Sequence, residues 1–104
     1  MDLGLKGRNA LVTGSSKGIG LAIARALAEE GCNVILVSRT QSDLDAAASQ
    51  IRSEFGVEAK GLAADLSVSG EVRRVAAEAG VVDILVNSAG AIPRGTLLEI
   101  DEER

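Results

Sequence analysis

Short apolar runs alternate along the chain with longer segments in which apolar residues recur every three or four positions. Each short run is bounded by turn-forming residues and is nearly continuous, without regular alternation between apolar and polar residues. Such runs are typical of strands that are buried on both faces, as in parallel sheets. We expect strands over residues 10–12, 34–37, 62–64 and 82–86.

The three segments between these runs have helical periodicity. Gly31, Gly56 and Gly80 follow the last apolar position of each segment and are natural C-terminal stops. The apolar stripes expected to face the sheet are, in chain order, Ile19, Ile23, Ala26 and Leu27; Leu44, Ala47, Ala48, Ile51 and Phe55; and Val68, Val72, Val75, Ala76 and Ala79.

Polar residues add detail to the first two helices. Arg25 and Glu29 are four positions apart, away from the apolar stripe, and we expect them to form an ion pair. Ser42 is expected to cap the second helix.

The order strand, helix, strand, repeated as far as the fourth strand, predicts βαβ units and hence an α/β protein. We expect one domain over 1–104 with a doubly wound, Rossmann-like parallel sheet of about four strands.

The C-terminal residues indicate that the fold continues beyond the end of this sequence. TLLE at 96–99 predicts a short turn with a capping box, and Asp101 is placed to cap a further helix. The sequence ends at Arg104, which leaves too few residues for a stable helix. A frayed natural C-terminus is the alternative, but the pattern favours a domain that is incomplete at its C-terminus, the truncated half of a larger one.

Composition narrows the class of protein. Hydrophobic residues make up 46% and charged residues 25%, which is typical of soluble globular proteins, and the 1% aromatic content requires an aliphatic core. A net charge of -4 argues against a nucleic-acid partner. No apolar run is long enough to span a membrane, and the N-terminal residues do not resemble a signal peptide. Cys32, the single cysteine, is expected to be a buried, inert thiol rather than a reactive one, and a cytoplasmic location fits best.

The segment TGSSKGIG, residues 13–20, joins the first expected strand to the first helix. Gly14 is placed for a sharp turn after the strand, Gly18 for close approach of the backbone to a bound group, and Gly20 for tight helix packing. Amides at the start of the helix, together with its dipole, would attract a pyrophosphate. The alternative is an ordinary turn, because the spacing differs from the common G-x-G-x-x-G pattern.

The end of the second strand bears on the choice of cofactor. An acidic residue there would hold the ribose 2′-hydroxyl of NAD, whereas an arginine suits the 2′-phosphate of NADP. The sequence has Ser38 and Arg39 at this place, and Lys17 supplies a second cation in the glycine loop. Both cations are solvated surface charges in the alternative interpretation. Their convergence, with no carboxylate present, favours NADP over NAD.

Asp65 and Asn87 follow the third and fourth expected strands. Ligands of open α/β sheets bind along the carboxyl edge of the strands, which makes both residues candidates for a binding site. A turn-forming or helix-capping role is the alternative for each.

Taken in order, TGSSKGIG, ADL at 64–66 and NSAG at 87–90 resemble the cofactor-binding half of the short-chain dehydrogenase/reductase family. The resemblance extends from Leu5 to the end of the sequence. It implies that Thr13 ties the glycine loop to the fourth strand. Ser88 departs from the family pattern, which usually has a second asparagine there, and the serine keeps a hydroxyl but lacks the amide.

The resemblance also implies roles for the residues of these motifs. Lys17, Ser38 and Arg39 match the members that prefer NADP. Ser16, Gly18 and Ile19 would meet the phosphates, Asp65 and Leu66 would flank the adenine, and Asn87, Ala89 and Gly90 would line the ribose and nicotinamide side.

The family resembled here transfers a hydride between nicotinamide and a carbonyl or alcohol substrate, and its complete members commonly form homo-oligomers. Its chemistry depends on a serine and a Tyr-x-x-x-Lys pair that lie beyond residue 104 of a typical member. This sequence has no Tyr and no His, so its three lysines lack a tyrosine to assist, and no metal-ligand cluster is apparent. We therefore expect the 104 residues to be inactive alone. The alternatives are a non-catalytic nucleotide-binding module and a non-functional fragment.

Overall fold

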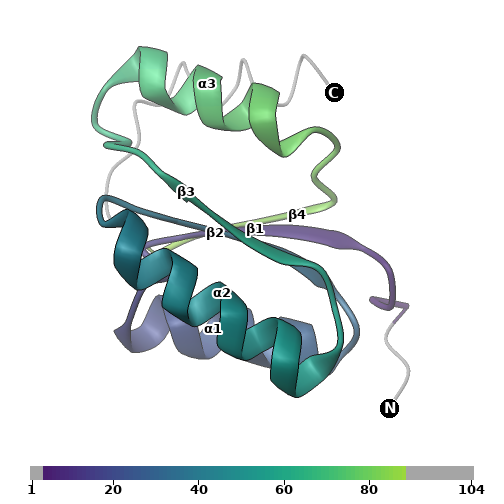
Figure 1. Cartoon of the computed structure of the whole chain (residues 1–104). Coiled ribbons are helices and arrows are strands. Elements are labelled where there is room, and N and C mark those ends of the chain that lie inside the picture. The colour runs from purple at the N-terminus through teal and green to yellow at the C-terminus, as the bar shows by residue number, and fades with distance from the viewer. Residues whose placement is uncertain (1–3, 89–104) are drawn as a thin grey trace.

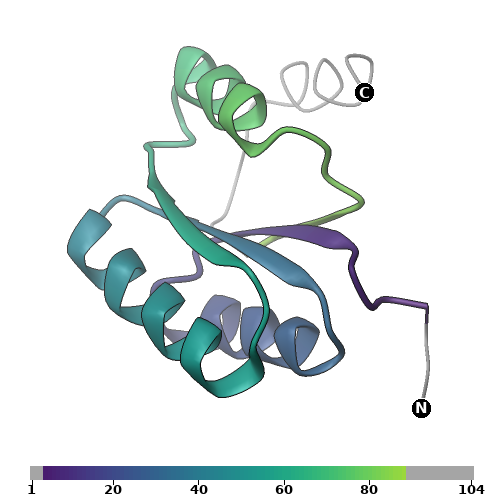
Figure 2. The same cartoon turned by 45° about the vertical axis from the view of Figure 1, so that its right-hand side comes forward.

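The computed structural model describes residues 4–88, which form a single parallel sheet covered by helices. The elements are β1 (Asn9–Thr13), α1 (Gly18–Glu29), β2 (Asn33–Ser38), α2 (Gln41–Phe55), β3 (Ala59–Ala63), α3 (Ser69–Ala79) and β4 (Ile84–Asn87). The strand order is β3-β2-β1-β4, and all neighbouring strands are parallel. Helices α1 and α2 lie on one face of the sheet and α3 lies on the other (Figures 1 and 2). The predicted α/β class and doubly wound parallel sheet are confirmed.

Strand β2 lies between two other strands, and its apolar residues are buried on both faces. Val34 and Leu36 belong to the core cluster formed with α1 and α2, whereas Ile35 and Val37 pack in a second cluster with Val75 of α3. This two-sided burial explains why the apolar run is continuous in the sequence.

The outer strands differ from the predicted ranges. Strand β3 begins at Ala59, earlier than predicted, because Lys60 and Gly61 pair with β2 although neither is a typical strand residue. Lys60 is exposed and Gly61 is half-buried, and the strand ends at Ala63. A Cβ on Gly61 would lie 2.5 Å from the Cβ of Leu44, so α2 packs close to this edge strand. Strand β4 begins only at Ile84 and forms the other edge of the described sheet. The capping box at 96–99 and the helix cap at Asp101 lie outside the described residues.

The buried face of α1 was predicted incorrectly. The residues that face the sheet are small and four positions apart, namely Gly20, Ala24 and Ala28, and Ile19 is 77% exposed. A stripe of small residues lets the helix axis approach the strands closely, and the larger apolar side chains then lie at the flanks of the contact. Periodicity alone favoured the larger residues, and only Leu27 of the predicted stripe packs partly against the core cluster.

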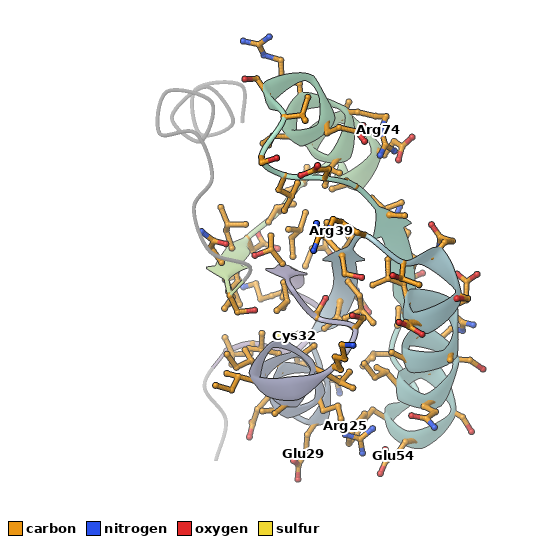
Figure 3. The ribbon with its side chains drawn as sticks, turned by 90° about the vertical axis from the view of Figure 1, so that its left-hand side faces the viewer. Arg25, Glu29, Cys32, Arg39, Glu54 and Arg74 are labelled. Atoms are coloured by element: carbon orange, nitrogen blue, oxygen red, sulfur yellow. The ribbon has the colours of Figure 1, made fainter. Side chains whose placement is uncertain are left out.

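Arg25 pairs with a residue of another helix, so its predicted pairing with Glu29 was wrong. Its guanidinium donates to the Glu54 carboxylate of α2 and lies 5.3 Å from the centroid of the Phe55 ring. Figure 3 shows Arg25 and Glu54 directed toward one another, with Glu29 turned away. The ion pair therefore joins α1 to α2, and the ring contact adds a cation–π interaction.

The apolar stripe of α2 was predicted correctly, since Leu44, Ala47, Ala48 and Ile51 are all buried. Ser42 does not cap this helix, because the helix begins at Gln41 and the N-cap position is occupied by Thr40. In α3, Val72 and Val75 are buried as predicted, but Val68 precedes the helix and is 50% exposed. Gly56 ends α2 with a positive φ of 70°, as its predicted role as a stop requires.

Cys32 is fully buried, as predicted. Its thiol donates to the carbonyl oxygen of Leu5 at 3.4 Å, and burial raises the pKa of the thiol, with a further contribution from Glu30. A raised pKa leaves less of the reactive thiolate near neutral pH, which agrees with an inert thiol.

Within residues 4–88, none of the helices has the length and apolar character needed to cross a membrane.

Candidate dinucleotide-binding site

The polar residues predicted to form a site converge on the carboxyl edge of the sheet. Because the strands are parallel, their carboxyl ends meet there: Thr13 is in register with both Val37 and Asn87, and Ser38 with Ala63. Figure 3 looks onto this edge and shows Arg39 lying across the strand ends, between the sheet and α3. The structure thus brings together the predicted residues Gly14, Ser16, Lys17, Gly18, Ile19, Gly20, Ser38, Arg39, Asp65, Leu66 and Asn87. Ala89 and Gly90 lie outside the described residues.

The glycine loop has the geometry that its spacing suggested. Gly14 and Gly18 both have φ of +64°, a conformation that favours glycine, and a Cβ on Gly18 would point into open space. Gly20 is buried against the loop, where an added Cβ would lie 2.1 Å from the carbonyl oxygen of Gly14. Gly20 therefore has a packing role, whereas Gly18 is exposed and leaves the backbone of the loop accessible.

The amino terminus of α1 is suited to an anion. The N-cap residue Lys17 makes no side-chain capping bond, and the first turn holds no acidic residue, in contrast to α2 with Asp43 and α3 with Glu71. The first backbone amides of a helix have no partner within the helix, and the dipole places partial positive charge there. The described residues at this helix start thus fit a phosphate group.

Side chains tie the loop to β4, as expected for Thr13. The hydroxyl of Thr13 donates to Asn87 Oδ1 at 2.8 Å and accepts from the amide of Ser88 at 3.0 Å. The Ser88 hydroxyl donates in turn to the carbonyl oxygen of Thr13. An added Cβ on Gly20 would also lie 2.6 Å from Ser88 Oγ. The serine that departs from the family pattern thus packs directly beneath the loop.

Ser15 is a site residue that the sequence interpretation missed. It is fully buried, and its hydroxyl donates to the Val12 carbonyl at 2.7 Å and accepts from the Val37 amide at 2.9 Å. Its own amide donates to the carbonyl of Val37 at 3.3 Å. The partner lies 22 positions along the chain, so nothing local in the sequence distinguishes Ser15 from an ordinary loop serine.

Asp65 has the turn-forming role that was considered for it, and it also lies on the carboxyl edge of the sheet. Its Oδ1 atom accepts from the hydroxyl of Ser67 at 2.6 Å and from the amide of Ser67 at 3.0 Å, which shapes the turn into α3. These two hydrogen bonds hold the pKa of the Asp65 carboxyl below its usual range, and the charge of Arg39 lowers it further. Arg39 and Asp65 follow the neighbouring strands β2 and β3, so a cation and a carboxylate lie on the same edge of the sheet, and the lowered pKa keeps Asp65 ionised at neutral pH.

Two cavities formed by described residues lie away from this edge. One of about 490 Å³ is at the amino end of the strands, where Asn33, Glu58 and Lys60 contribute to its lining. The other, about 710 Å³, lies between α1 and α2 beside Arg25 and Glu54. Neither of these two cavities is lined by a predicted site residue.

Comparison with known proteins identifies the family. The family model described as short chain dehydrogenase matches residues 8–104, and the chain belongs to this family. L-xylulose reductase from Bos taurus is 44% identical over 103 residues, which cover 99% of this chain and 40% of the relative. The 2-dehydro-3-deoxy-D-gluconate 5-dehydrogenase of Formosa agariphila is 37% identical over 102 residues and is covered to 38% of its length. The chain thus spans about two fifths of these relatives.

Solved structures with the same fold include complexes with NADPH. L-sorbose reductase from Gluconobacter frateurii, complexed with NADPH and L-sorbose, matches with a TM-score of 0.84 and 42% identity, over 88% of this chain and 36% of that chain. A short-chain dehydrogenase from Sphingobium yanoikuyae in complex with NADPH matches with a TM-score of 0.74 and 37% identity, over 80% of this chain and 34% of that one.

Proposed function

We propose that this chain is the amino-terminal, NADP-binding part of an oxidoreductase that transfers a hydride between nicotinamide and a carbonyl or alcohol substrate. The observation that carries the proposal is that the acid-free start of α1 and Arg39, which follows the neighbouring strand β2, lie on the same carboxyl edge of the sheet. Membership in the family and the NADPH complexes of similar structures support it.

We assign each group of residues along the carboxyl edge of the sheet to a different portion of the cofactor. The amides at Ser16, Gly18 and Ile19 hold the pyrophosphate, because they lie where the α1 dipole is positive. The guanidinium of Arg39, assisted by Lys17 and Ser38, holds the 2′-phosphate. Asp65 and Leu66 flank the adenine, and Asn87, Ala89 and Gly90 line the ribose and nicotinamide side.

The bound cofactor would supply the hydride, and the described residues bind and orient it. Thr13 and Ser88 hold the loop against β4, which fixes the start of α1 relative to Asn87. No tyrosine or histidine occurs in the sequence to donate a proton to the substrate oxygen. We therefore propose that the 104 residues bind the cofactor without completing the reaction.

The first test compares the two nicotinamide cofactors by calorimetry. NADPH should bind more tightly than NADH by roughly ten- to a hundredfold, the range that a charge-assisted phosphate contact is worth. Arg39→Asp should remove most of this difference, since it replaces the attracting guanidinium with a repelling carboxylate. Arg73→Asp, at an exposed position of α3, changes the net charge equally and should leave the ratio intact. Equal affinities in the unaltered protein would refute the assignment to NADP.

The second test concerns catalysis by the 104-residue chain. With NADPH and a panel of ketose, aldehyde and ketone substrates, oxidation of NADPH should not exceed the rate without protein, because the proton donor is lacking. A complete short-chain reductase run in parallel establishes that the assay detects turnover. Reproducible turnover that Arg39→Asp abolishes would contradict the proposal, because it would show that this cofactor site supports chemistry unaided.

A further inference from the structure

The hydroxyl of Ser15 connects two strand ends that carry different parts of the candidate site. It donates to the Val12 carbonyl of β1 and accepts from the Val37 amide of β2, at 2.7 Å and 2.9 Å. The Ser15 amide also donates to the Val37 carbonyl at 3.3 Å. Ser15 is fully buried, so water does not compete for these bonds.

Val37, which Ser15 contacts, directly precedes Ser38 and Arg39. Thr13 already pairs with Val37 in the sheet, and the loop returns after Gly14 to contact Val37 a second time through Ser15. The glycine loop is thereby fastened to the strand end that bears Arg39. The ties formed by Thr13 and Ser88 run to β4 on the other side of β1 and do not involve β2.

A ligand that contacts both the glycine loop and Arg39 is sensitive to the distance between them. The pyrophosphate and the 2′-phosphate of NADPH are joined by a single ribose, so the loop amides and the Arg39 guanidinium must be held at one spacing to bind both. NADH has only the pyrophosphate and demands no such spacing. Binding sites of this kind lose affinity when the loss of a supporting contact lets the ligand-binding groups shift by about 0.5 Å or more.

We propose that Ser15 is a positioning residue that sets the preference for NADPH over NADH, by holding the glycine loop at a fixed distance from Arg39. This inference rests on the proposed function of the site. Ser15 acts through Arg39 and the loop amides and touches no reacting atom. A serine at this place thus contributes to cofactor selectivity although its side chain is buried and does not reach the ligand.

The test is a double-mutant cycle on the ratio of the NADPH and NADH dissociation constants, measured by calorimetry. Ser15→Ala should lower the preference for NADPH by roughly three- to tenfold, because the loop amides and Arg39 are then no longer held at the one spacing that NADPH requires. In an Arg39→Gln background, Ser15→Ala should leave the ratio unchanged, because the group through which Ser15 acts is gone.

Asn33→Ala provides the matched control at the opposite edge of the sheet. Asn33 also joins neighbouring segments, since its Oδ1 accepts from the Glu58 amide at 3.1 Å and its Nδ2 donates to Asn9 Oδ1 at 3.3 Å. Its removal should lower the melting temperature and leave the cofactor ratio as it was. If Ser15→Ala weakens both cofactors equally, or changes the ratio as much in the Arg39→Gln background, the inference is overturned.

The outcomes for the inference and for the proposed function differ. A starting protein without preference for NADPH refutes the proposed function, and the inference with it. A preference that persists in Ser15→Ala refutes the inference alone.

If Ser15→Ala does not fold, amide hydrogen exchange of the unaltered chain tests the inference instead. The Val37 amide should exchange slowly and be slowed further by NADPH than by NADH, whereas equal slowing by the two cofactors would overturn the inference.

Discussion

Replacing Gly20 with alanine should destabilise the folded chain by about 3 kcal/mol, the upper end of the usual cost of overpacking. The added Cβ would lie 2.1 Å from the carbonyl oxygen and 2.7 Å from the carbonyl carbon of Gly14. Neither backbone atom belongs to a flexible side chain, so the loop or the start of α1 has to move. Urea unfolding followed by circular dichroism measures the loss, and the affinity for NADPH should fall with it.

Gly70→Ala is the matched control for this substitution. Gly70 lies in the first turn of α3, and an added Cβ there would have no atom within 4 Å. Alanine at this position should stabilise the chain by about 0.5–1 kcal/mol, because glycine loses more backbone entropy on folding. The same chemical change should therefore have opposite signs at the two positions. A Gly20→Ala protein as stable as the original would contradict the close packing of α1 on the loop.

Leu36→Ala should cost about 2–5 kcal/mol, as expected for a fully buried leucine in a close-packed core. Leu36 is on the interior strand β2, 0% exposed, and belongs to the cluster formed with α1 and α2. Domains of this size are stable by about 5–15 kcal/mol, so the loss is a large fraction of the total. The midpoint of urea unfolding should fall, with little change in its slope.

Leu85→Ala removes the same atoms from the edge strand β4. Leu85 is 36% exposed, so less apolar surface returns to water and the cost should be about 1 kcal/mol or less. Equal losses at Leu36 and Leu85 would contradict the position of β2 in the interior of the sheet, since burial would then not distinguish the two leucines.

Much of the candidate site followed from the sequence because parallel strands bring their carboxyl ends together. Once each apolar run was assigned to a strand, Arg39 after β2, Asp65 after β3 and Asn87 at the end of β4 had to lie along one edge. The stripe of α2 was equally predictable, since large apolar residues mark its buried face. These features depend on residue type and local spacing, which a sequence displays directly.

Other features depend on contacts between distant segments. The buried face of α1 consists of Gly20, Ala24 and Ala28, because the helix packs so closely that only small residues fit. Arg25 pairs with Glu54, 29 positions away, although Glu29 has the right spacing on the same helix. The spacing of residues within α1 cannot reveal these contacts, since the neighbouring strands and α2 determine which residues of the helix are contacted.

Local periodicity and parallel connectivity are enough to predict the order of strands and helices along the chain, the edge at which the polar residues gather and the open start of α1. The contact of Ser15 with Val37 and the packing of Gly20 on Gly14 are seen only in the folded chain. Both contacts bring backbone atoms of separate segments to close range, and this happens only after folding. No local pattern of residues encodes that distance.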